Sequence, residues 1–193
     1  KLESMGHVVK LMAPQFVKPY VKTNKNDAAD AEAICEAVTR PSMRFVAPKS
    51  VQQQSMLSIH RVRSLLVAER TAIANQTRGL LSEFGIVIPQ GIKTLRARLP
   101  DILEDAENEL PSEMRDLITM LNERIQSITE NVDSLEQKIR QINKQHEQIK
   151  RLEDIPGIGP LTASAFVATI GNIDMFKNGR ELAAFLGLMP RQH

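Results

Sequence analysis

The longest regular feature of the chain is a repeat of apolar residues between Met114 and Ile149. Their spacing alternates between four and three positions, with one polar interruption at His146. Such spacing, kept over about five heptads, predicts one continuous helix with a narrow apolar seam. At 1.5 Å per residue this helix would be roughly 50 Å long. The repeat consists of Met114, Ile118, Leu121, Ile125, Ile128, Val132, Leu135, Ile139, Ile142 and Ile149.

A seam of this length needs a second helix to cover it, because alone it would leave its apolar side chains in water. Two arrangements satisfy the pattern: pairing with a second copy of the chain, or antiparallel packing on another helix of the same chain. Periodicity does not distinguish them. In the first, a homodimer or homotetramer forms, and charged substitutions at Ile125 and Val132 should separate the protomers. The candidate dimerisation residues are then Ile118, Leu121, Ile125, Ile128, Val132, Leu135, Ile139 and Ile142.

The rest of the pattern is also mainly helical. A second long helix is predicted from about Ser50 to Phe84, and a short one from Glu181 to Leu188. The residues from His7 to Ala13 read as a short buried strand, followed by a helix that starts at about Asn26 or Asp27. This strand and helix form the one βα unit of the pattern, which looks like the end of an α/β domain.

The composition favours a helical protein, and the cysteine content fits a reducing compartment. The chain has 42% hydrophobic residues, one Tyr and no Trp, and its single cysteine, Cys35, excludes an internal disulfide framework. No apolar run reaches the ~18 residues that a membrane span needs. We therefore expect a cytoplasmic protein with no membrane partner.

Charge is distributed unevenly along the chain, although the formal net charge is only +2. Between Arg40 and Arg98 there are ten Lys and Arg against the two acids Glu69 and Glu83, a surplus of eight. A basic segment of this kind indicates contact with nucleic acid. The alternative is an ordinary solvated helix face.

Two carboxylates begin the first predicted helix. Asp27 and Asp30 are spaced i, i+3, which places them on one helix face. Paired carboxylate oxygens can hold a hard cation such as Mg²⁺, and a phosphoryl-transfer enzyme could use that metal. The alternative is helix capping and compensation of the helix dipole.

Two further patterns indicate nucleic-acid contacts. In the second helix, Arg63, Arg70 and Arg78 lie within roughly a quarter-turn of one another, with Asn75 nearby. Such a face can bind phosphates through charge and reach bases or sugars through amides. In the segment Ile155-Pro156-Gly157-Ile158-Gly159, the glycines permit a tight turn whose N–H groups point outward, as in a helix-hairpin-helix element. Gly157, Ile158 and Gly159 are therefore candidates for binding a DNA phosphate, the alternative being a helix connection that binds nothing.

Three stretches together resemble one family. They are K-N-D-A-A-D-A (25–31), L-V-A-E-R-T-A-I-A-N-Q-T-R-G-L-L-S-E-F-G (66–85), and I-P-G-I-G-P-L-T-A with G-R-E-L-A-A-F-L-G-L-M-P-R-Q-H (155–163 and 179–193). They are similar to the DEDD-type insertion-sequence transposases, which are related to the Piv invertases and are also called bridge recombinases. The resemblance covers nearly the whole chain in the family's order.

The resemblance implies a division into three parts. Residues 1–48 would be the C-terminal part of an RNase H-like (RuvC-like) α/β domain, in which Asp27 and Asp30 are two of four catalytic acids that bind Mg²⁺. Residues 49–151 would be a long coiled-coil region, whose Arg63, Arg70, Asn75 and Arg78 contact a structured guide RNA. Residues 152–193 would begin a small helical transposase domain with the helix-hairpin-helix-like element.

The resemblance also implies an RNA-guided DNA recombinase of bacteria, acting at the nucleoid. The family's first Asp and its Glu would precede Lys1, and its nucleophilic Ser would follow His193, so we expect the chain to be truncated at both ends and inactive alone. A non-catalytic coiled-coil module that binds nucleic acid is the alternative, and a purely structural scaffold is a third hypothesis.

Overall fold

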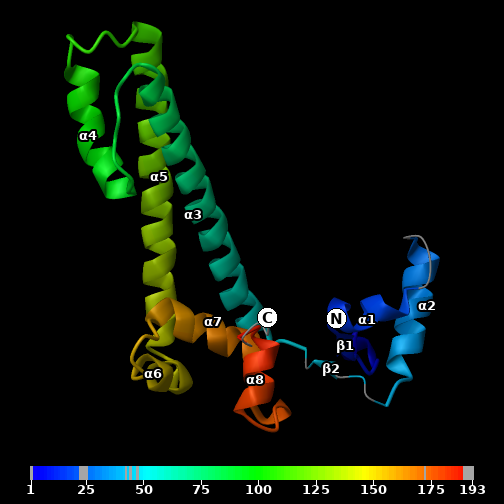
Figure 1. Cartoon of the computed structure of the whole chain (residues 1–193). Helices are drawn as coiled ribbons and strands as arrows, with labels where there is room; N and C mark the ends of the chain where they lie inside the picture. The colour runs from blue at the N-terminus through cyan, green and yellow to red at the C-terminus, as the bar shows by residue number, and fades with distance from the viewer. Residues whose placement is uncertain are drawn as a thin grey trace. The chain divides into compact units, whose positions relative to one another are not determined.

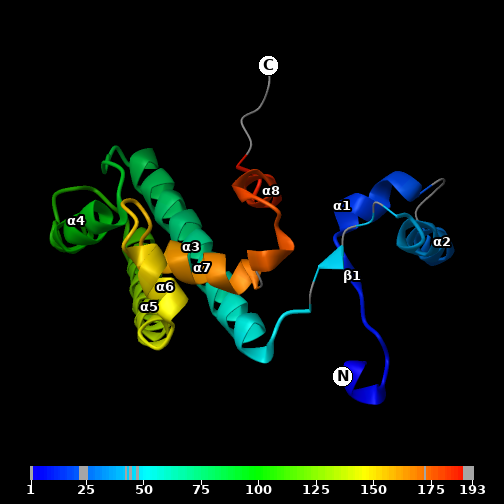
Figure 2. The same cartoon turned by 90° about the horizontal axis from the view of Figure 1, so that it is seen from below.

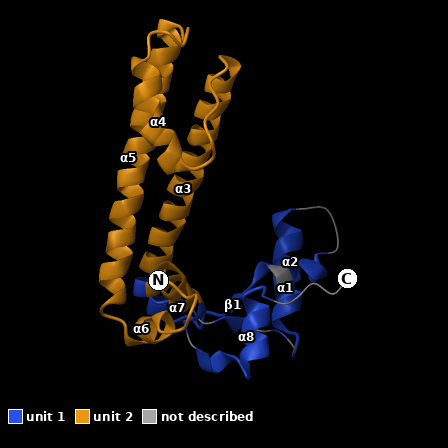
Figure 3. Ribbon diagram, turned by 60° about the vertical axis from the view of Figure 1, so that its left-hand side comes forward, with its two compact units in different colours: residues 1–52, 170–193 blue, residues 53–169 orange. Residues whose placement is uncertain are grey.

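A computed structural model describes residues 2–21, 26–41, 43, 45–46, 48–171 and 173–188. The chain forms two compact units, residues 53–169 in one and residues 1–52 with 170–193 in the other (Figure 3). The predicted mainly helical fold is confirmed. In the described part of the chain, none of the helices combines the length and hydrophobicity that crossing a membrane requires.

The N-terminal part contains the only strands that the structure describes. Strand β1 (Leu11–Met12) pairs antiparallel with β2 (Phe45–Val46), in the register Leu11 opposite Val46 and Met12 opposite Phe45. The short helix α1 (Pro14–Val17) and the 3-10 turn Lys18–Tyr20 pack against α2 (Asp27–Val38) (Figure 2). The predicted strand is thus only two residues long, and the RNase H-like origin of residues 1–48 stays a prediction.

The larger unit is an antiparallel helical hairpin (Figure 1). Helix α3 (Val51–Glu83) confirms the predicted second helix, and α5 (Ser112–Asn143) runs back beside it. Polar contacts give the direction: Arg63 bonds to Glu136, whereas Arg70, seven residues later, bonds to Thr129, seven residues earlier. Because the contact moves seven residues forward along α3 and seven residues backward along α5, the two helices are antiparallel.

The apolar seam of α5 is buried within the single chain. Ile118, Ile125, Val132 and Ile139 are at most 2% exposed, and Ile128 is 1% exposed. Leu121, Leu135 and Ile142 are half-buried. Of the two arrangements, the structure has the intramolecular one, and dimerisation through this seam stays a prediction that would require the hairpin to open.

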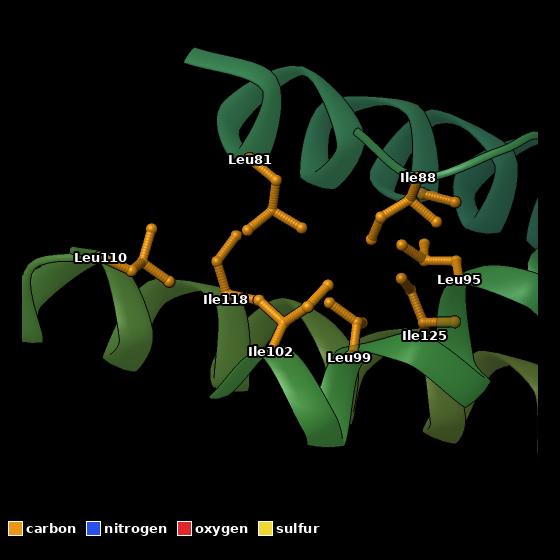
Figure 4. Close-up of a cluster of buried hydrophobic side chains, with 9 residues drawn as sticks. Leu81, Ile88, Leu95, Leu99, Ile102, Leu110, Ile118 and Ile125 are labelled. Atoms are coloured by element: carbon orange, nitrogen blue, oxygen red, sulfur yellow. The ribbon is translucent and has the colours of Figure 1, made fainter. Parts of the chain in front are cut away.

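A short helix fills one end of the hairpin. Helix α4 (Ile92–Glu104) lies in the stretch between α3 and α5, for which the sequence analysis predicts no helix. Its apolar side chains join those of α3, α5 and the adjoining loops (Figure 4). The resulting cluster comprises Ala74, Leu81, Ile88, Leu95, Leu99, Ile102, Leu110, Ile118 and Ile125.

Arg115 of α5 closes the loop that follows α4. Its guanidinium donates to the backbone carbonyls of Leu103 at 2.7 Å and Asp105 at 2.7 Å, and to Asn108 Oδ1 at 2.6 Å. It also reaches the carbonyls of Leu110 and Ile102. A planar fork with several N–H groups suits this role, because the last carbonyls of a helix have no partner inside the helix.

The prediction of one continuous helix up to Ile149 is wrong. Helix α5 ends at Asn143, and a separate helix, α6 (Glu147–Glu153), begins after His146, whose backbone is extended. The bend places Ile149 in the interior, 1% exposed. Helix α7 (Pro160–Ile170) follows, then the 3-10 turn Ile173–Met175 and α8 (Gly179–Phe185).

Candidate nucleic-acid interface

Asp27 and Asp30 both lie in the first turn of α2. The Asn26 side chain caps this helix by accepting a hydrogen bond from the Ala29 N–H at 2.7 Å, so neither aspartate is needed as the cap. Asp27 is exposed and Asp30 is half-buried. No group of three or more His, Cys, Asp or Glu side chains that could hold a metal occurs among the described residues. The pair therefore offers two carboxylates from one face.

The three arginines predicted to contact RNA all bond within the chain. Arg63 donates to Glu136 Oε1, with Nε at 2.9 Å, and Arg70 reaches Thr129 Oγ1 at 3.4 Å. Arg78 donates to the carbonyls of Gly91 at 2.7 Å and Pro89 at 3.2 Å. These contacts join α3 to α5 and to the loop before α4.

Asn75, the fourth residue predicted to contact RNA, bonds within its own helix, whereas the three arginines bond to residues outside α3. Asn75 is exposed, and its Oδ1 accepts a hydrogen bond from Arg78 Nη1 at 3.2 Å. The structure thus brings Asn75 and Arg78 together and leaves the amide accessible. Whether this face contacts RNA is still a prediction from charge and resemblance.

The Gly157–Gly159 turn joins α6 to α7. Gly157 has φ +92°, a conformation that favours glycine, and the Ile158 N–H donates to the Ile155 carbonyl at 3.0 Å. Gly159 is not in a positive-φ conformation, and a Cβ built on it would meet nothing within 4 Å. Gly157 is therefore explained by the turn itself, whereas packing does not explain Gly159.

The side chain of Asn143 supports this turn through hydrogen bonds to residues on both sides of it. The sequence analysis does not identify this residue. Its buried Nδ2 donates to the Pro160 carbonyl at 3.0 Å and to Glu153 Oε1 at 3.0 Å. It thereby ties the end of α5 to both α6 and α7. The sequence carried no signal for Asn143, because a polar residue directly after Ile142 fits the apolar repeat, whose interruption is at His146.

His60 of α3 and Ser164 of α7 are in contact, so α7 is joined to α3 as well as to α5. Ser164 is fully buried, and its hydroxyl donates to the Pro160 carbonyl at 2.8 Å, while His60 Nε2 lies 3.0 Å from its Oγ. Because the hydroxyl proton is used, this network favours a proton on His60 Nε2. Burial lowers the pKa of His60 below its ordinary value of 6.5, and the positive charge of Arg63 lowers it further.

We expect the hairpin to lose stability as the pH falls through the ordinary pKa of His60. The folded-state pKa lies below 6.5, so the unfolded chain takes up the proton first and is favoured. This contribution is constant above that pH and declines as the pH drops toward the lowered value. Thermal unfolding measured over a pH series should show the decline, and His60→Gln should flatten it. An equally steep decline in the variant would assign the effect to other groups.

Comparisons with known proteins match two regions of the chain, one with the aspartate pair and one with the Gly157–Gly159 turn. Residues 149–193 match the model described as "Transposase IS116/IS110/IS902 family", and residues 3–86 match the DEDD IS110 model, described as "Transposase". A Pseudomonas aeruginosa protein named "Probable family 20 transposase" is 47% identical over 194 residues, which cover 100% of this chain and 57% of that protein. This chain carries two transposase regions of the IS110/IS116 family.

Other relatives of the chain carry insertion-sequence names. The transposase for insertion sequence element IS1328 of Yersinia enterocolitica is 43% identical, over 100% of this chain and 57% of its own length. The transposase for insertion sequence element IS1111A of Coxiella burnetii is 42% identical, over 98% of this chain and 52% of its own. The chain thus spans about half the length of the curated relatives it matches. No solved structure matches it.

The family matches confirm the resemblance predicted from the three sequence stretches. Asp27, Asp30 and all of α3 lie inside the DEDD match, and the Gly157–Gly159 turn lies inside the other. Helices α4 and α5 lie entirely between the two matched regions. Lys25 and the last residues, 189–193, which belong to the quoted stretches, lie outside the described residues.

Proposed function

We propose that this chain forms part of a transposase that cleaves and rejoins DNA at the ends of a mobile element, with an element-encoded RNA as guide. The observation that carries the proposal is the presence of both family regions, in order, on either side of α4 and α5. Assembly as a dimer or tetramer, in a bacterial cytoplasm at the nucleoid, is part of the same proposal.

Asp27 and Asp30 would hold the protein's share of a Mg²⁺ site. Mg²⁺ is commonly bound through one or two carboxylates, while substrate phosphates and water complete its octahedral shell. Two carboxylates at i, i+3 in the first turn of a helix that is capped by a different residue fit that requirement. A metal bound there would stabilise negative charge on phosphate oxygens of the DNA.

The Gly157–Gly159 turn would bind a phosphate of the DNA backbone. Support comes from Gly159, because neither backbone conformation nor packing against the described residues requires glycine there. A glycine in open space lets a phosphate approach backbone N–H groups at the start of a helix. Asn143 and Ser164 both bond to the Pro160 carbonyl and would hold the turn for that contact.

We expect Gly159→Ala to weaken DNA binding roughly tenfold without lowering stability. The added methyl group meets no described atom of the chain but occupies the space of an approaching phosphate, and one such contact contributes on the order of 1 kcal/mol. Fluorescence anisotropy titrations with a labelled DNA duplex at low salt would measure the affinity. Thermal unfolding of the same samples would verify the fold.

Two comparisons make this test specific. Gly79→Ala introduces the same methyl group on α3, where a Cβ also meets nothing within 4 Å, and should leave the affinity unchanged. Equal affinities of wild type and Gly159→Ala would show that the turn is only a helix connection. No binding of the wild type at low salt would contradict the transposase proposal itself and support a structural scaffold.

A further inference from the structure

The arginines and lysines of the hairpin fall into two groups. One group bonds inside the chain through hydrogen bonds or ion pairs. Lys93 and Arg96 of α4 belong to the other group: both are exposed, and neither makes a hydrogen bond or ion pair with the residues that the structure describes. The internally bonded arginines of the hairpin are Arg63, Arg70, Arg78, Arg115 and Arg124.

Helix α4 carries its charges in the order that opposes its own stability. Lys93 and Arg96 lie near its N-terminal end, whereas Asp101 and Glu104 lie toward its C-terminal end. A helix dipole favours the reverse, acids at the start and bases at the end, by roughly 0.3–1 kcal/mol per charge. The N-cap residue, Gly91, adds no side-chain hydrogen bond. Residues that break a local stability rule without an internal compensation indicate a binding function.

The outward face of α4 offers charge without any base-reading group. Leu95, Leu99 and Ile102 are buried on the hairpin side. At 100° per residue, Lys93 and Arg96 lie about 60° apart on the opposite side, with Ala97 and Pro100 as their exposed neighbours. This face has no amide and no aromatic ring.

The position of this face is held by Arg78. Its guanidinium donates to the carbonyls of Gly91, immediately before α4, at 2.7 Å and of Pro89 at 3.2 Å. The apolar cluster beneath α4 completes the support (Figure 4). The two cations therefore stand on a rigid, packed helix, as a recurring contact with a regular ligand requires.

We propose that Lys93 and Arg96 of α4 bind the phosphate backbone of duplex DNA. This inference rests on the proposed transposase function and adds a contact surface that lies between the two family-matched regions. Single-stranded nucleic acid and RNA loops are bound largely by stacking on aromatic side chains, which this face lacks. Duplex backbone needs only regularly placed cations, and these would read no sequence.

The test compares the 193-residue chain with its Lys93→Gln/Arg96→Gln double variant. Anisotropy titrations with a labelled DNA duplex would be repeated over a series of salt concentrations. Each lost phosphate contact removes about 0.9 from the slope of log affinity against log salt, so the slope should shrink by about 1.8. At the salt concentration where the wild type binds well, the affinity should fall roughly tenfold. Because glutamine is a good helix former and removes the unfavourable charges, circular dichroism should show an intact fold.

The matched control is Lys138→Gln/Arg140→Gln, which removes one exposed lysine and one exposed arginine from α5. It should change affinity and slope far less than the α4 variant does. An equal loss in both variants would mean a general charge effect and overturn the inference, as would unchanged affinity of the α4 variant. A loss for duplex RNA but not for duplex DNA would also overturn it.

A second copy of the chain is the competing occupant, because the basic and acidic halves of α4 could pair in an antiparallel dimer. Sedimentation of the α4 variant distinguishes the two. A change of oligomeric mass with unchanged DNA affinity would assign the face to self-association and overturn the inference. If the wild type fails to bind DNA at any salt concentration, the proposed function fails instead, since the α4 comparison presupposes wild-type binding.

Discussion

Replacing Ile125 with Asp should unfold the α3–α5 hairpin. Ile125 is fully buried in the cluster formed by α3, α4 and α5 (Figure 4). An unpaired carboxylate at such a site costs about 3–5 kcal/mol, in addition to the lost burial of the apolar side chain. Single domains are stable by only ~5–15 kcal/mol, so the loss is a large part of the total. Circular dichroism and thermal unfolding would measure it.

The control lies on the same helix, one and a half turns away. Met120 is 56% exposed, and Met120→Asp should change the free energy of unfolding by less than about 0.5 kcal/mol. The comparison also separates the two ways of covering the seam. If the Ile125→Asp chain kept its helix content and only lost oligomeric mass, the seam would pair two copies of the chain and not two helices of one chain.

Replacing Asp27 with Asn should reduce DNA cleavage by two or more orders of magnitude in a full-length protein that contains this chain. The proposed metal contributes several kcal/mol of charge stabilisation, and each 1.36 kcal/mol corresponds to a factor of ten in rate. Asn removes the charged ligand with little change in shape, and Asn26 continues to cap α2. The fold should therefore persist while the reaction fails.

A readout apart from activity tests the metal site directly. Fe²⁺ bound in place of Mg²⁺ reduces added hydrogen peroxide to hydroxyl radicals, with ascorbate regenerating Fe²⁺, and these radicals cut the chain near the metal. This cutting should map to the start of α2 and disappear in Asp27→Asn. Glu32→Gln, which removes an exposed carboxylate from the opposite face of the same helix, should change neither cutting nor cleavage. Cleavage that survives Asp27→Asn would contradict the metal role of Asp27 and place the catalytic groups outside this chain's aspartate pair.

The two long helices illustrate which structural features can be read from local pattern. The apolar spacing predicted α3 to within a residue at each end, because propensity and periodicity act along the chain. Helix α4 was missed because Pro100 and a concentration of charge hide its short apolar stripe. That stripe becomes recognisable only when Leu95 and Leu99 meet the side chains of α3 and α5. Similarly, α5 ends at Asn143 because that side chain bonds to residues of the next two helices.

The candidate site also combines features set by neighbouring residues with features set by tertiary contacts. Asp27 and Asp30 were found from their spacing, since a helix start brings i and i+3 together without help from the rest of the fold. The accessible cations were not found this way. Arg63 and Arg78 share a helix face, and sequence could not reveal that Glu136 and the Gly91 carbonyl, both distant in the chain, take up their guanidinium groups. Lys93 and Arg96 of α4, by contrast, are exposed and make no hydrogen bond or ion pair with the described residues.

From the amino-acid sequence alone follow the helical class of this chain, its family, the aspartate pair and the glycine turn, because each depends on residues close together in the chain. The tertiary structure decided how the apolar seam is covered, where α5 ends and which arginines are used internally. Those features depend on contacts between different elements of the fold, whose partners lie between 10 and 73 residues apart in the chain. Local periodicity carries no information about such partners, so only packing could select them.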